Sequence, residues 1–271
     1  MDPDHDAKFP LHEAAREGKT QTAESLVNAN PKLANTKDDD ERLPIHWAVA
    51  YNHLPIVELL VSTKNFDPDV EDGSGWTPLM IASSLKNAEG DPIIELLLRK
   101  GADVTAKSNS GQVHTTPSTP STPHARKRSK EKQTADHRMN GIPTQNALHF
   151  ATSKANISTV RTLIANKCSA RVKDKRGQLP LHRAAAIGST AIINILLKDG
   201  KSPANATDMD GMTALHHAIC EGHGDAAITL LKAGAETDKR DADGRLAIDM
   251  APDGKVKGYI IQTAEREGIE L

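Results

Sequence analysis

Aromatic residues, cysteines and long apolar runs are all scarce in this chain. Phe, Trp and Tyr make up only 3% of its 271 residues, so its core must come from small aliphatic side chains. Its two cysteines, Cys168 and Cys220, are too few for a disulfide framework and fit a reducing compartment. No apolar run approaches the roughly 18 residues of a membrane span, and no secretory signal pattern opens the sequence. We therefore expect a soluble, intracellular protein.

An excess of charge of one sign is also absent. The chain has 34 Lys and Arg residues and 36 Asp and Glu residues, which gives a net charge of −2. A nearly neutral chain has no global field that draws it to nucleic acid or to a membrane. We therefore expect neither of these as a partner, and we expect the isolated chain to be a monomer.

The sequence does contain a phrase close to Pro-Leu-His-x-Ala that occurs seven times. Its central Leu or Ile lies at positions 11, 45, 79, 148, 181, 215 and 248, so the intervals are 34, 34, 69, 33, 34 and 33 residues. A fixed period near 33 predicts a solenoid of stacked supersecondary units. The doubled interval indicates one unit with an insertion.

The fifth unit shows how each unit is expected to fold. Residues 174–178 form a turn that contains Gly177, and Pro180 then begins a helix because its fixed φ suits the first helical position. Gly188 ends that helix, and the apolar stripe of residues 192–197 indicates a second one. Each unit is therefore predicted to be a β-turn followed by two antiparallel helices, and the fold class all-α.

Five histidines hold the same place in successive units. In a stack of helix pairs such a row is spaced by about 10 Å, whereas zinc ligands converge to about 2 Å from one ion. We therefore expect each imidazole to bond the backbone near its turn, with no metal and no cofactor. Phosphate-binding loops and nucleophile motifs are also missing, which argues against an enzyme. The five are His12, His46, His149, His182 and His216.

The repeated phrase, with Gly-Ala-Asp-Val at 101–104 and Gly-Ala-Glu at 234–236, resembles the ankyrin repeat over residues 9–261. The resemblance implies an ankyrin-repeat solenoid of about seven helix-turn-helix repeats with β-turn fingers, so that 1–271 is a single domain. It also implies a concave face, lined by the fingers and first helices, on which partners usually bind.

Three rows of side chains on that face follow from aligning the units. They are the residue after the motif His, the residue four further on, and the residue two before the Pro. Exposed aromatics beside Arg are typical of a binding hot spot, although Trp47 and Trp76 would alternatively pack on neighbouring turns. The predicted partner-binding residues are Asp40, Arg42, Trp47, Tyr51, Asp72, Trp76, Phe150, Lys154, Arg183, Met212, His217, Glu221 and Arg245.

The acidic turn before Ile45-His46-Trp47 and the segments 172–189 and 221–227 resemble the gankyrin family, and its fungal members in particular. This resemblance implies a non-catalytic chaperone for assembly of the proteasome regulatory-particle base. Such a chaperone holds the C-terminal domain of one ATPase subunit on its concave face, and precursors of the base are then partners. The positions similar to the family's contacts are Arg42, Lys154, Trp47 and Trp76. A general ankyrin adaptor in signalling or transcription is the alternative.

The insertion at 113–145 interrupts the turn of the fourth unit. Its Thr-Pro-rich and basic composition predicts a disordered, low-complexity segment. The run Arg126-Lys127-Arg128 suits a nuclear localisation signal or, alternatively, a solvated loop. We accordingly expect a cytoplasmic and nuclear protein.

Overall fold

The computed structural model describes residues 8–108 and 145–270, and within them it forms seven helix pairs. The first helices of the pairs are α2 (Pro10–Glu17), α4 (Pro44–Ala50), α6 (Pro78–Ser83), α8 (Ala147–Ser153), α10 (Pro180–Ala186), α12 (Ala214–Cys220) and the 3-10 helix η3 (Ala247–Met250). The second helices are α3 (Thr20–Ala29), α5 (Leu54–Val61), α7 (Asp91–Arg99), α9 (Ile157–Ala165), α11 (Thr190–Lys198), α13 (Gly224–Lys232) and α14 (Gly254–Arg266). Two more 3-10 helices, η1 (Pro31–Asn35) and η2 (Lys86–Ala88), lie in connections.

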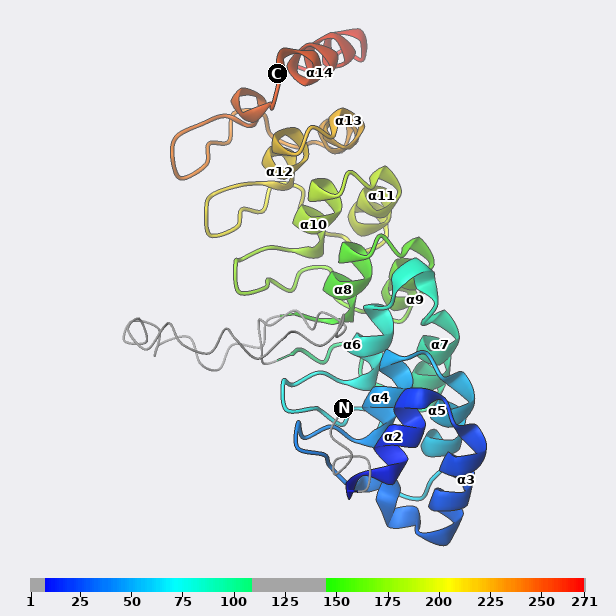
Figure 1. Ribbon diagram of the computed structural model, residues 1–271. Helices are drawn as coiled ribbons and strands as arrows, with labels where there is room; N and C mark the ends of the chain where they lie inside the picture. The colour runs from blue at the N-terminus through cyan, green and yellow to red at the C-terminus, as the bar shows by residue number, and fades with distance from the viewer. Residues whose placement is uncertain (1–7, 109–144, 271) are drawn as a thin grey trace, which may run out of the picture.

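The pairs stack in chain order into a curved solenoid (Figure 1). Each first helix packs on the first helix of the next unit, and each second helix packs on the next second helix. The fingers leave the stack on the side of the first helices, which are therefore the inner helices, and the second helices form the outer layer (Figure 1). The predicted all-α solenoid of seven units is confirmed.

The helix boundaries follow from the residues at each end. Proline occupies the first position of α2, α4, α6 and α10, where no backbone donor is needed. At the end of α10, Gly188 takes φ of 70°, and a Cβ there would lie 2.6 Å from the ring of His223. His223 in turn bonds the Ala186 carbonyl through Nε2 at 3.1 Å. This close approach ties one unit to the next and requires glycine.

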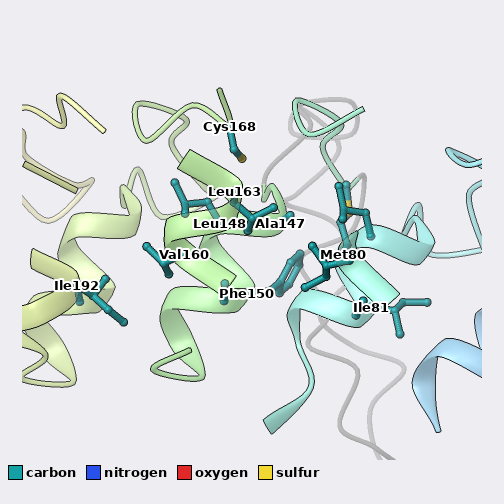
Figure 2. Close-up of a cluster of buried hydrophobic side chains, with 14 of the residues drawn as sticks. Met80, Ile81, Ala147, Leu148, Phe150, Val160, Leu163, Cys168 and Ile192 are labelled. Atoms are coloured by element: carbon teal, nitrogen blue, oxygen red, sulfur yellow. The ribbon is translucent and has the colours of Figure 1, made fainter. Parts of the chain in front are cut away.

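Small aliphatic side chains fill the space between helices, and the core is continuous across the junction of units 3 and 4. Met80 of α6 lies beside Phe150 of α8, and both belong to one buried cluster with Ala147 and Leu148 (Figure 2). The predicted insertion lies outside the described residues except for Gln145, whose carbonyl accepts the Ser108 N–H at 2.8 Å. The chain therefore re-enters the stack beside the point at which it left. No helix of the described residues is long and apolar enough to span a membrane.

Candidate partner-binding face

Five fingers are each held by one buried aspartate, a feature that the sequence reasoning missed. One carboxylate oxygen of each accepts the backbone N–H groups of the second and fourth residues that follow, at 2.8–3.0 Å. Because both donors belong to the same turn, the carboxylate fixes the finger's shape and compensates its own burial. The five are Asp38, Asp72, Asp174, Asp208 and Asp241, each exposed by 5–8%.

The second oxygen of each aspartate binds a residue that the sequence predicts to contact a partner. Trp47 Nε1 donates to Asp38 at 2.7 Å, Arg183 Nη2 to Asp174 at 2.6 Å, and His217 Nε2 to Asp208 at 2.8 Å. Arg42 Nε reaches Asp72 in the next finger at 3.2 Å, and Arg245 Nη2 lies 2.7 Å from Asp241. The polar groups of these five predicted site residues are therefore bonded to the chain's own fingers. A nine-residue spacing from aspartate to row residue, as in 38–47, 174–183 and 208–217, was the available signal.

The electrostatics of the finger that contains Asp208 show how strong this anchoring is. Burial by itself would raise the pKa of Asp208, but hydrogen bonds from His217 and from the Met212 N–H outweigh it and hold that pKa below its usual range. Met212, another predicted contact, thus serves the finger through its backbone while its side chain stays half-buried. Of the two aspartates predicted to contact a partner, Asp72 is buried in its finger, whereas Asp40 is exposed.

Two of the predicted contact aromatics are core residues. Trp76 is 3% exposed and Phe150 is 6% exposed, and their ring centroids lie 4.2 Å apart across the junction of units 3 and 4. Figure 2 shows Phe150 pointing from α8 toward Met80 of α6. The expectation of exposure is therefore wrong for both. Two large rings that fill the space between adjacent units lose more water-exposed area there than on an open face.

The other two aromatics form a cluster that remains partly open. The Arg42 guanidinium lies 4.9 Å from the centre of the Trp47 ring. The Tyr51 ring is stacked with the Trp47 ring, and the two ring centroids lie 6.2 Å apart. Trp47 is half-buried, while Tyr51 is 41% exposed. An aromatic pair with a held cation is the composition of a binding hot spot.

The row at the C-terminal ends of the inner helices is the exposed one. Tyr51, Lys154 and Glu221 directly follow α4, α8 and α12, and all three are exposed. Ile187 follows α10 and is 38% exposed, although the sequence reasoning did not select it as a contact. The structure therefore offers a partner one row of mixed charge and apolar surface, beside the cluster of Arg42, Trp47 and Tyr51.

The motif histidines link successive units. Nε2 of His46, His149 and His182 donates to the carbonyls of Val70, Gln178 and Ala206, which lie in the next finger or just before it, at 3.1–3.2 Å. Nδ1 accepts a backbone N–H at the start of the histidine's own helix. His12 and His216 bond Arg42 and Arg245 carbonyls in the same way. The predicted backbone role is confirmed.

Burial keeps four of these imidazoles neutral. Desolvation lowers the pKa of His149 and His182 to about 4, and it also lowers the pKa of His46 and His216. Within residues 8–108 and 145–270, no three side chains of His, Cys, Asp or Glu gather closely enough to hold a metal ion.

Known proteins share this arrangement. A family model of ankyrin repeats, in three copies, matches residues 4–108 and 145–241. The human ASB11 ankyrin repeat domain aligns with a TM-score of 0.72 at 19% identity, over 93% of this chain and 96% of that one. The Bcl-3 ankyrin repeat domain aligns with a TM-score of 0.67 at 22% identity, over 93% and 97%. The fold is that of an ankyrin-repeat protein.

Sequence relatives narrow the class further. The Saccharomyces cerevisiae protein named probable 26S proteasome regulatory subunit p28 is 35% identical over 94% of this chain and 98% of its own length. The chain therefore belongs to the gankyrin family of ankyrin-repeat proteins. An ankyrin repeat-containing protein of Schizosaccharomyces pombe is 30% identical over 92% of both chains. The Dictyostelium discoideum 26S proteasome non-ATPase regulatory subunit 10 is 34% identical over 34% of this chain and 39% of its own.

Proposed function

We propose that this protein is a non-catalytic chaperone for assembly of the proteasome regulatory-particle base. It holds the C-terminal domain of one ATPase subunit on its concave face, in contact with precursors of the base. Its near full-length similarity to a protein named as a proteasome regulatory subunit supports this proposal.

The observation that carries the proposal is the exposed row on the inner helices. Tyr51, Lys154, Ile187 and Glu221, which belong to units 2, 4, 5 and 6, present an aromatic ring, a cation, an aliphatic side chain and a carboxylate. Such a surface fits a folded domain with complementary charge and apolar points, because charge sets register and the buried apolar anchors supply most of the affinity. It does not resemble a reaction site, since the hydrogen bonds that recur in the fingers already occupy the buried carboxylates and imidazoles.

Capture from a native lysate tests the proposal. The tagged chain should retain proteasomal ATPase subunits, and Lys154→Glu should reduce that capture at least about tenfold, because it reverses a charge at the centre of the row. Arg99→Glu is the matched control, since it makes the same charge reversal at the exposed end of an outer helix, α7, away from the row. Arg42→Glu is a poorer probe, because it would place a carboxylate against Asp72.

Three results would count against the proposal. The first is a lysate capture without ATPase subunits, which would favour a general ankyrin adaptor. The second is equal capture by Lys154→Glu and the unaltered chain, and the third is equal loss in Lys154→Glu and Arg99→Glu. The expected location in cytoplasm and nucleus stays a prediction.

A further inference from the structure

Charge is distributed in blocks along the solenoid, although the net charge is small. Units 4 and 5, residues 147–206, contain ten Lys and Arg residues and only two acidic residues. On one side, residues 8–108 contain 11 basic and 16 acidic residues, and on the other side residues 207–270 contain seven basic and 13 acidic residues. The middle of the stack is therefore strongly basic between two acidic ends.

Half of this basic block lies on the outer layer. Arg161 is on α9 and Lys198 ends α11, while Lys167, Arg171 and Lys201 lie in the loops that follow these two helices. The helices are neighbours in the outer layer (Figure 1). Arg171 Nε donates to the Lys201 carbonyl at 3.0 Å, which joins the two loops. All five residues are exposed, and we call them the outer basic patch.

The charges of the patch lack counterions within the described part of the chain. None of its five side chains lies within ion-pair distance of a carboxylate there, whereas cations in the acidic ends are commonly paired, as in Lys8–Asp39 and Lys257–Asp249. Clustered like charges repel one another and create a local positive potential. An anionic ligand would relieve this repulsion.

The surroundings of the patch limit what that ligand can be. Units are spaced by about 10 Å, so the two-unit patch spans roughly 20 Å, the length of about six extended residues. A longer polyanion would meet the acidic units on either side. Single-stranded nucleic acid is bound on aromatic platforms, and the single aromatic of units 4 and 5, Phe150, is buried.

We propose that the outer basic patch binds a short segment, rich in Asp and Glu, of a partner protein. The patch lies on the layer opposite the inner helices, so this second binding surface is independent of the proposed grip on an ATPase domain. It gives the stack two faces, one of mixed character and one for an acidic peptide.

Fluorescence anisotropy with the full chain tests this proposal. The probe is a dye-labelled peptide of about eight alternating Asp and Glu residues, titrated at about 50 mM and 200 mM salt because screening weakens exposed charge pairs. The triple variant Arg171→Glu/Lys198→Glu/Lys201→Glu should weaken binding at least about tenfold. The matched control is Lys32→Glu/Lys64→Glu/Lys255→Glu, which changes net charge equally on the acidic units and should weaken binding less than about twofold.

Four outcomes would overturn the proposal. They are no peptide binding at low salt, equal weakening by both triple variants, equally tight and equally patch-dependent binding of a single-stranded oligonucleotide, and patch-dependent self-association in sedimentation. Circular dichroism melts of both variants establish that each is folded, so that a loss of binding reports on the patch.

Discussion

At the scale of single residues, the buried finger aspartates contribute more to the stability of the stack than their exposed neighbours do. Asp174 accepts two backbone N–H groups and the Arg183 guanidinium, and its side chain is 2% exposed. Asp210, in the next finger, pairs with Arg176 at 3.7 Å, and both of those side chains are more than 60% exposed. The two carboxylates are therefore a matched buried and exposed pair.

Replacing Asp174 by Ala should cost about 2–4 kcal/mol of unfolding free energy, because it leaves a half-buried guanidinium and two backbone donors unpaired. Asp210→Ala should change it by less than about 0.5 kcal/mol. Urea unfolding followed by circular dichroism gives both values. Equal effects of the two substitutions would show that Asp174 does not hold its finger.

The buried histidines make stability depend on pH. With a pKa of about 4 in the folded state and about 6.5 in the unfolded state, His149 and His182 are neutral when folded, and the unfolded chain takes up protons first as the pH falls. Stability is therefore complete above pH 6.5 and is lost as the pH falls toward 4, by about 2 kcal/mol for each histidine at pH 5.

Urea midpoints at about pH 7.5 and pH 5 measure this loss. His182→Met should lower stability at pH 7.5 but reduce the pH dependence by about 2 kcal/mol, since Met80 already holds the same place in unit 3. A chain equally stable at both pH values would contradict the assignment of neutral, bonded imidazoles.

At the scale of elements, the inner helices are joined by glycine–histidine contacts. Gly188→Ala should destabilise the stack by about 2–3 kcal/mol, because it adds a methyl group against the His223 ring to the strain of a positive φ. Gly234→Ala, at φ of 85° with nothing within 4 Å of its Cβ, should cost only about 1 kcal/mol. Thermal and urea unfolding compare the two, and similar losses would mean that backbone strain alone acts at Gly188.

Element boundaries were the most predictable part of this fold, because proline and glycine act locally. The helix beginning at Pro180 and its end at Gly188 follow from single residues. The last unit departs from the others, since η3 makes only a short 3-10 helix before Pro252, which cannot continue a helix. The burial of Trp76 and Phe150 was not predictable from row position, because it depends on how two units fit together across the junction.

At the scale of the whole molecule, the solenoid separates structure from recognition. Buried aspartates and histidines bond the units and fingers together, and side chains at the ends of inner helices remain free for a partner. Aligning the repeats was sufficient to find Tyr51, Lys154 and Glu221, since an exposed position recurs at the same place in most units. The alignment did not distinguish the side chains that are bonded to a finger aspartate, because those bonds arise only in three dimensions.

Calorimetric titration of the purified chain with purified C-terminal domains of the proteasomal ATPase subunits tests the central claim most directly. We predict one-to-one binding of one of these domains, weakened at least about tenfold by Tyr51→Ala and by Lys154→Glu and unchanged by Arg99→Glu. Absence of binding by every domain, or binding that neither inner-face substitution weakens, would contradict the account.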